Sequence, residues 1–367
     1  MSLPLHHAEL QNANIIARTT CPGKGRSNAQ VLACLRALTP QQLVSLIPDS
    51  WNTPGLFGMP LDPSGEHWAG LVIVDGVTIP YAFDEALARG DVSSNVPLMI
   101  GAMGQECDEW PDFQQVQTYS DAQWRKYLVD FFAPWDALQA DRTHDTTLIG
   151  ADKESIPVGE RLYRLYRNES SDNPQKAFDS LMSDYGNNCA NVQIAQHTLS
   201  PLGNYQAPIY HFVNNYHLSK SFVSDPSTNY TVRYASHVYD YLMALEQWSA
   251  FDNGAYLPDE RDLQGSALLQ TLWYNFMLTG NPTPVGRETY TSYTTVHTGL
   301  SDSRVQTHTL SPWKAVNEVN NFPHDYNTYV IQSDNGEESQ TVQNYHSEKC
   351  DYLHTIGISE RQFWWCN

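Results

Sequence analysis

The sequence of 367 residues contains no run of 18 apolar residues, the length that a helix needs to cross a bilayer. Cys-x-x-Cys, His-Glu-x-x-His and Gly-x-Gly-x-x-Gly strings are missing too, so no motif predicts a metal or an organic cofactor. Basic residues are scarce: 21 Lys and Arg stand against 41 Asp and Glu, for a formal net charge of −20. Such a charge repels nucleic acid and anionic membranes. We therefore expect no nucleic-acid partner, no transmembrane segment, no metal and no cofactor.

The composition is that of a chain that folds. Apolar residues make up 41% and aromatic residues 12%, enough to bury a core, and the length allows one large domain or two ordinary ones. The segment Met1–Glu9 lacks the basic flank and apolar centre of a secretory signal peptide. Two acceptor sequons, beginning at Asn168 and Asn229, suit a secreted glycoprotein. We predict both asparagines as glycosylation sites.

Six cysteines stand at positions 21, 34, 107, 189, 350 and 366. No two of them have the close spacing of a zinc or redox site, which favours disulfides or unpaired thiols. Cys21 and Cys34 enclose a Gly-rich polar stretch that we interpret as a loop. A bridge between them would contribute about 3 kcal/mol by closing it.

The most informative local pattern is an apolar run, typical of a buried strand, that is followed directly by carboxylates. The apolar run from Val96 to Met103 breaks at Gly104 and is followed by the carboxylates Glu106, Asp108 and Glu109. Open α/β sheets keep their chemistry at the carboxyl ends of their strands. An ordinary acidic turn after a strand has the same composition, so the pattern alone leaves both interpretations open.

Hydrophobic spacing outlines the other elements. Acids at the start, Leu268, Leu272 and Phe276 four apart, and Gly280 at the end predict a helix over 259–280. The apolar run 207–213 predicts the last main strand. Residues 50–70, rich in Pro, Gly and Trp, are interpreted as a packed loop. Further helices are expected in 8–20, 82–90, 119–140 and 156–185 and from Thr39-Pro40 onward.

Three ordered strings resemble the type-B carboxylesterase and cholinesterase family. Val31-Leu-Ala-Cys-Leu-Arg36 matches its "L-V-x-C-L-R", and Leu71-Val-Ile-Val-Asp-Gly-Val-Thr-Ile-Pro80 matches its "V-V-D-G-x-x-x-P". Trp273-Tyr-Asn-Phe-Met-Leu-Thr-Gly-Asn-Pro282 is very similar to "W-x-N-F-x-x-T-G-x-P". The resemblance implies an α/β-hydrolase fold. It covers nearly the whole chain but only about the C-terminal two-thirds of the family's domain, so residues 1–367 are expected to form a partial domain with an incomplete central sheet.

The resemblance also assigns site residues. The family's acid-bearing strand ends in "G-x-x-x-D-E-G", which places Glu106 on the catalytic acid. Cys107 stands where the family usually has Gly, so Asp108 stays open as an alternative acid. The family's "G-x-x-H-x-x-E/D" matches the segment that makes His237 the catalytic base and Asp240 its nearby carboxylate.

By the same resemblance, Cys21 pairs with Cys34, and Cys189 pairs with Cys350 across the family's long C-terminal loop. Cys107 and Cys366 are left over: the first is interpreted as a buried core thiol and the second as a link to another chain, which would give a dimer. Disulfides and sequons together favour a secreted protein or one of the ER lumen.

Two parts of an esterase site have no source in the sequence. Neither Gly-x-Ser-x-Gly nor His-Gly-Gly occurs, so the nucleophile and the oxyanion donors are missing, and we expect the chain to be inactive alone. One hypothesis is a truncated product whose full-length parent hydrolyses carboxylic esters by a Ser-Glu-His mechanism. Two others remain open, namely a non-catalytic cholinesterase-like binding or adhesion protein, and a degenerate remnant.

Overall fold

The structure is a computed structural model that describes residues 2–23, 25–47, 72–91, 96–109, 116–142, 156–170, 174–199, 205–225, 229–295, 303–332 and 338–356. Contacts divide the chain into two compact units, residues 1–86 and 87–362, and helix α4 (Phe83–Arg89) includes residues of both. The loop expected at 50–70 and Cys366 lie outside the described residues. Within the described ranges, no helix has the length and apolar character needed to cross a membrane.

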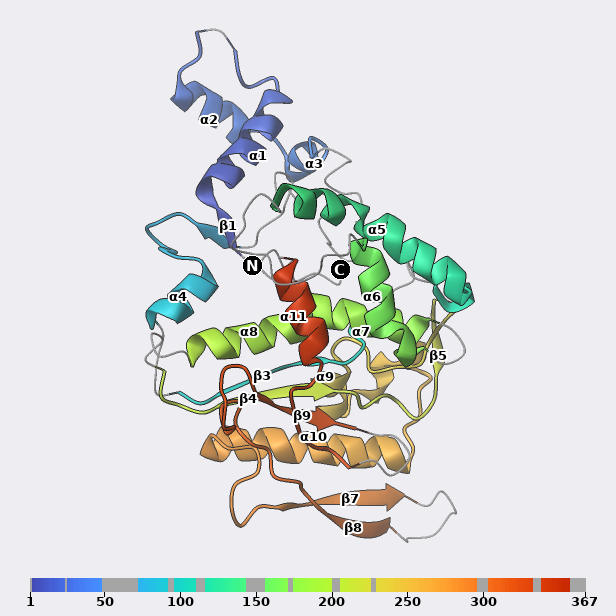
Figure 1. Cartoon of the computed structure of the whole chain (residues 1–367). Helices are drawn as coiled ribbons and strands as arrows, with labels where there is room; N and C mark the ends of the chain where they lie inside the picture. Colours follow the sequence, from blue (N-terminus) through green and yellow to red (C-terminus); the bar gives the residue numbers. More distant parts are fainter. Residues whose placement is uncertain are drawn as a thin grey trace. The chain divides into compact units, whose positions relative to one another are not determined.

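Before α4, the described residues of the first unit include two short parallel strands and three helices (Figure 1). They are β1 (Ser2–Pro4), α1 (Leu5–Ala17), α2 (Asn28–Arg36), α3 (Pro40–Val44) and β2 (Val72–Val74). The helix predicted from Thr39-Pro40 is confirmed as α3. Thr39 caps it, because its hydroxyl accepts from the backbone N–H of Gln42 at 3.2 Å while the Gln42 side chain accepts from the N–H of Thr39 at 2.8 Å.

The interpretation of the stretch between Cys21 and Cys34 as a loop is wrong for its second half. Helix α2 begins there at Asn28, because Ser27 and Gln30 form a second capping box. The Gln30 side chain accepts from the backbone N–H of Ser27 at 2.8 Å. The Ser-x-x-Gln signal was in the sequence, but the glycines just before it obscured the start of the helix.

The second unit is built on a four-stranded sheet with the order β10-β9-β4-β3. Its strands are β3 (Leu98–Met103), β4 (Ile209–Asn214), β9 (Asn327–Ile331) and β10 (Gln340–Gln343). The first three are parallel, with Leu98 opposite Ile209 and Phe212 opposite Tyr329, while β10 runs antiparallel to β9. The strand predicted at 207–213 is confirmed, but it is not the last main one, since β9 and β10 follow it. Both strands are short, lie within a Thr- and Tyr-rich region and contain few apolar residues, so no apolar run marks them.

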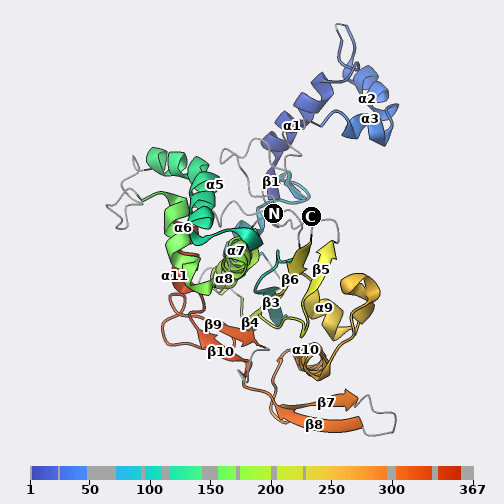
Figure 2. The ribbon, with the colours of Figure 1, turned by 90° about the vertical axis from the view of Figure 1, so that its right-hand side faces the viewer.

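Helices cover both faces of this sheet (Figures 1 and 2). Because side chains alternate along a strand, Ile209 packs in a cluster with Val192 and Ala195 of α8, whereas the ring of Tyr210 lies 6.2 Å from that of Phe276 on α10. The helices are α5 (Asp121–Arg142), α6 (Val158–Tyr166), α7 (Gln175–Ser183), the π-helical turn η6 (Asp184–Asn188), α8 (Cys189–Thr198), α9 (Tyr239–Ala244), α10 (Glu260–Thr279) and α11 (Ser347–Thr355). This layering is that of an α/β fold.

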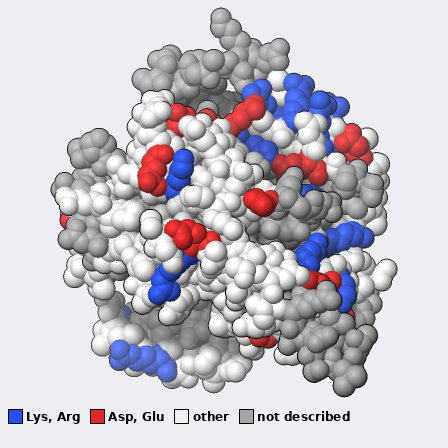
Figure 3. All heavy atoms as spheres, turned by 90° about the horizontal axis from the view of Figure 1, so that it is seen from below, with Lys and Arg blue, Asp and Glu red and all other residues white. Residues whose placement is uncertain are grey.

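Helix α10 confirms the clearest helix prediction. Asp259 caps its start, and Gly280 ends it in the left-handed conformation at φ 74°. Beyond it lies an antiparallel pair of strands, β7 (Thr289–Thr295) and β8 (Ser303–Thr309), and a second antiparallel pair, β5 (Phe222–Asp225) with β6 (Tyr230–Val232), stands before α9. The face seen in Figure 3 shows acidic and basic side chains interspersed among uncharged ones, so the net negative charge is not gathered into one patch there.

Candidate active site

The turn after β3 carries the predicted acid. At Gly104, where the chain leaves the strand, the side chain of Asn215 lies where a Cβ would stand, so the turn packs closely against Asn215. The backbone N–H of Met103 then donates to Oε1 of Glu106 at 2.8 Å. Glu106 is 6% exposed. The carboxylate is therefore fixed at the carboxyl end of a parallel strand, the edge of the sheet where we expected it.

The imidazole of His237 lies against this carboxylate. Nδ1 of His237 is 2.7 Å from Oε2 of Glu106, and the backbone N–H of His237 donates to the Glu106 carbonyl at 3.0 Å. In a third bond, the backbone N–H of Gln105 donates to the Ala235 carbonyl at 3.0 Å, so the turn that contains Glu106 pairs with the segment that contains His237. Glu106 and His237, 131 residues apart in sequence, are thus joined by both side chains and backbone.

This contact determines which imidazole nitrogen can act as a base. An ionised carboxylate only accepts hydrogen bonds, so Nδ1 carries the proton that Glu106 accepts and the lone pair of the neutral ring is on Nε2. The His237 side chain is 46% exposed, whereas that of Glu106 is 8% exposed. A buried carboxylate behind a half-exposed imidazole is the arrangement in which a histidine can take a proton from a reacting group and give it back.

Asp108 has a different set of contacts. It is fully buried, and its Oδ2 accepts the backbone N–H groups of Arg233 and Tyr234, each at 2.7 Å. Its Oδ1 accepts from Gln175 Nε2 and, at 3.3 Å, from the Tyr230 hydroxyl. The structure thus brings His237 to Glu106, while Asp108 holds the chain that leads into the His237 turn.

Two further carboxylates lie near the imidazole. Burial, and less strongly the Glu106 charge, raises the pKa of Asp240 to about 6, whereas the N–H of Tyr241 acts in the opposite direction. Burial and the neighbouring Asp108 raise the pKa of Glu109, which His237 lowers. Asp240 therefore lies close enough to the pair to interact with it, as the sequence predicts.

Helix α7 supports the acid turn through side chains that sequence reasoning missed. The Ser183 hydroxyl accepts from the backbone N–H of Glu106 at 2.6 Å, and the Ser180 hydroxyl accepts from Gln105 Nε2 at 3.2 Å. Gln175, at the first turn of α7, reaches Asp108. Gln175, Asp179 and Ser183 stand four residues apart, a polar stripe along the helix that the apolar pattern had led us to overlook.

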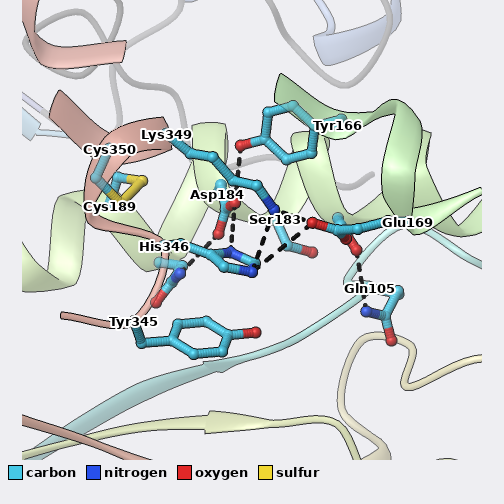
Figure 4. Close-up of polar contacts among 12 residues, drawn as sticks. Gln105, Tyr166, Glu169, Ser183, Asp184, Cys189, Tyr345, His346, Lys349 and Cys350 are labelled. Atoms are coloured by element: carbon cyan, nitrogen blue, oxygen red, sulfur yellow. Dashed lines mark hydrogen bonds and ion pairs between the residues drawn. A yellow bond between two sulfur atoms is a disulfide. The ribbon is translucent and has the colours of Figure 1, made fainter. Parts of the chain in front are cut away.

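A second carboxylate–histidine pair lies close by, where α11 begins (Figure 4). Nδ1 of His346 is 2.7 Å from Oδ2 of Asp184, the residue after Ser183, and the same oxygen accepts the Tyr166 hydroxyl at 2.7 Å. Lys349 contacts Glu169 and places its Nζ 4.3 Å from the centre of the Tyr166 ring. No motif pointed to this cluster, because His346 and Asp184 are 162 residues apart.

The structure contains both disulfides that the resemblance implied, Cys21–Cys34 and Cys189–Cys350. Cys107 is buried, at 2% exposed. Asn168 and Asn229, the two sequon asparagines, are exposed, and their glycosylation stays a prediction. Within the described ranges, no three His, Cys, Asp or Glu side chains gather where they could hold a metal ion.

The sheet is mainly parallel, helices cover both of its faces, and a carboxylate at the end of one strand bonds to a histidine from a later turn. This architecture is that of an α/β hydrolase. The comparison with known families agrees. The model of the carboxylesterase family matches residues 3–352, and the chain belongs to that family. A search of curated proteins found no match.

Proposed function

We propose that Glu106 and His237 are the acid and base of a Ser-Glu-His esterase site acting on carboxylic esters. The observation that carries the proposal is the contact of 2.7 Å between the buried Glu106 carboxylate and Nδ1 of His237. Membership of the carboxylesterase family supports ester hydrolysis as the reaction class. Asp108 binds Gln175 and backbone N–H groups, whereas Glu106 binds His237, and this difference supports Glu106 as the acid.

In this mechanism, Nε2 of His237 takes the proton of a serine hydroxyl as the oxygen attacks the ester carbonyl. The imidazolium then gives that proton to the leaving alcohol, and water repeats the cycle to release the acid. Glu106 holds the ring in the required tautomer and stabilises the imidazolium. The serine and the oxyanion donors must come from outside this sequence, which contains neither motif.

Two experiments test this proposal. The first determines the 5′ end of the native transcript; we expect an upstream frame that encodes His-Gly-Gly and Gly-x-Ser-x-Gly.

The second measures hydrolysis of an aryl acetate by the 367-residue chain, and we expect its rate to match that in buffer alone. Turnover that an organophosphate blocks would show that the chain has its own serine, and an upstream frame without the elbow would remove the esterase assignment.

A non-catalytic binding or adhesion protein is the alternative, and the lack of Gly-x-Ser-x-Gly is the observation in its favour. Secretion, sequon glycosylation and dimerisation through Cys366 are compatible with both functions. The two disulfides support an oxidising compartment such as the ER lumen. Mass spectrometry of the secreted protein before and after reduction and deglycosylation tests these three features.

A further inference from the structure

Helix α10 is apolar on two opposite sides in its C-terminal half. On the inner side, Leu269 and Leu272 are 0% exposed and belong to the core. On the outer side, Tyr274 is 55% exposed, Met277 is 76% exposed and Leu278 is 54% exposed. A surface helix ordinarily carries polar residues opposite its buried stripe, whereas a helix that is apolar all round is covered on every side. This pattern indicates a second contact surface on the outer side of α10.

The outer side is one continuous face of the helix. With 3.6 residues per turn, Gln270 and Thr271, one turn before Tyr274, lie on the same side as Met277 and Leu278, one turn after it. An open hollow lies beside the helix, and Gln270, Thr271 and Tyr274 line it together with residues of the segment that follows α10. The face therefore has an apolar ridge at one end, formed by Met277 and Leu278, and a hollow at the other.

Hydrogen bonds fix the wall of this hollow. The side chain of Asn275, which is 2% exposed, donates through Nδ2 to the carbonyls of Pro282 and Arg287, at 3.2 and 3.3 Å. These bonds fold the segment after α10 back along the helix, where the Arg287 guanidinium lies 5.9 Å from the centre of the Tyr274 ring. Groups that are already ordered lose little conformational freedom when a partner binds. The face can therefore bind without first rearranging.

Charge favours one kind of partner for this face. No Asp, Glu, Lys or Arg occurs between Asp262 and Arg287, whereas the whole chain has a formal net charge of −20. Two copies of such an acidic chain repel each other, and the repulsion is weakest where the meeting surfaces carry no acid. A helix that lies on a membrane surface is rich in Lys and Arg on its polar side, but α10 contains one, Arg261. A second copy therefore fits this face better than a lipid surface does.

We propose that the outer face of α10 binds the same face of a second copy, with the two helices antiparallel and Tyr274 nearest the two-fold axis. Each residue then faces its counterpart on the other side of Tyr274, so Met277 of one copy meets Thr271 of the second copy, and Leu278 meets Gln270. The ridge of each copy enters the hollow of the other. A patch that binds itself closes after two copies, which gives a dimer. This dimer depends neither on ester hydrolysis nor on a disulfide.

The first test is sedimentation velocity of the 367-residue chain over a concentration series, with Cys366→Ser in every protein to exclude a disulfide link. We expect a reversible dimer whose Kd falls severalfold when NaCl is raised from about 0.05 M to about 0.5 M, because salt screens the repulsion between acidic copies. Met277→Glu with Leu278→Glu should raise Kd by at least about 100-fold, since the contact would then hold four carboxylates. The control Leu257→Glu, at a side chain that is 74% exposed just before α10, should leave Kd within about twofold.

Three results of this test would overturn the proposal. The first is a chain that stays monomeric at about 100 µM, well above the Kd of a specific dimer. The second is a dimer that the two glutamates leave unchanged, because its surface would then lie elsewhere. The third is a monomer that binds phosphatidylcholine vesicles and loses this binding with the two glutamates, because the occupant of the face would then be lipid. The salt dependence is measured on the unmutated face, so it decides even if the double variant fails to fold.

Cysteine cross-linking tests the position of the axis in the same Cys366→Ser background. Tyr274→Cys should place two thiols opposite each other, so mild oxidation should join the copies covalently, whereas Leu257→Cys should stay monomeric. A mixture of Met277→Cys and Thr271→Cys should give mainly the mixed dimer, because these positions face each other in the antiparallel pair. Equal cross-linking of Tyr274→Cys and Leu257→Cys, or no preference for the mixed dimer, would contradict the proposed arrangement.

Discussion

Two histidines of this protein make the same contact in different surroundings. Nδ1 of His237 is 2.7 Å from Glu106, and Nδ1 of His346 is 2.7 Å from Asp184. The side chain of His237 is 46% exposed, whereas that of His346 is 20% exposed and stacks on Tyr345 with ring centres 4.0 Å apart. Nε2 of His346 is 3.2 Å from Nζ of Lys349. A carboxylate on Nδ1 is therefore not sufficient to make a catalytic base, because the other nitrogen must be able to meet a reacting group.

We expect the second pair to have a structural role. His346 precedes α11, and the Cys189–Cys350 bridge joins that helix to α8. Asp184, which His346 binds, follows Ser183, which holds the backbone of Glu106. The buried pair thus attaches α11 next to the residue that supports the acid. One carboxylate–histidine pair acts on substrate in our proposal, and the other fixes the scaffold beside it.

The largest expected difference between the two histidines is the loss of catalytic activity when each is replaced. In a form of the enzyme that includes the nucleophile, His237→Ala should lower kcat for an aryl acetate by at least about 10⁴-fold, because the base is lost. His346→Ala should lower it by less than about tenfold per folded molecule. Kinetics normalised to active-site titration measure both. Equal losses in the two variants would remove the distinction between the pairs.

Stability should distinguish the two histidines in the opposite order, with the larger loss on removal of His346. His346→Ala leaves Asp184, whose side chain is 3% exposed, without its imidazole partner and should cost about 3 kcal/mol of the free energy of unfolding. The same change at His237 also takes the imidazole from a buried carboxylate, but because the ring is half-exposed, water can take its place against Glu106, and the cost should be less than about 1 kcal/mol. Urea denaturation of the 367-residue chain measures both values, and a larger loss for His237→Ala would contradict the assignment of roles.

The smallest effect concerns the lysine beside His346. Burial lowers the pKa of Lys349 to about 7 from the ordinary value of 10.5, while the contact with Glu169 favours the charged form. Above about pH 7 the unfolded chain keeps a proton that folded Lys349 releases, so this residue makes the protein more stable as the pH rises toward 10.5. Lys349→Met should flatten that rise in thermal unfolding scans, and the exposed control Lys126→Met should not.

Local signals in the sequence predicted much of the framework. Acids, apolar spacing and Gly280 defined α10, and the apolar run before Gly104 defined β3. The family strings supplied the proposed acid and histidine and both disulfides. These features were accessible because each depends on residues that are neighbours in the chain or on an ordered motif.

The remainder depends on how distant segments meet. Glu106 and Asp108 follow the same strand two residues apart, and no periodicity in a turn says which side chain points to His237. Gln175 of α7 meets Asp108 only after both have folded onto the sheet. The Asp184–His346 pair joins residues 162 apart without a motif. In each case tertiary packing, and not local pattern, determines the role of the residue.

The most direct test of the central claim is the tautomer of His237 in the neutral state, read from the ¹⁵N chemical shifts of its ring and assigned with His237→Ala. We predict a proton on Nδ1 and a lone pair on Nε2 in wild type, and loss of that preference in Glu106→Ala. His346 should show the same tautomer in both proteins, which makes it an internal control. A proton on Nε2 of His237 in wild type would contradict the assignment of Glu106 and His237 as the acid and base.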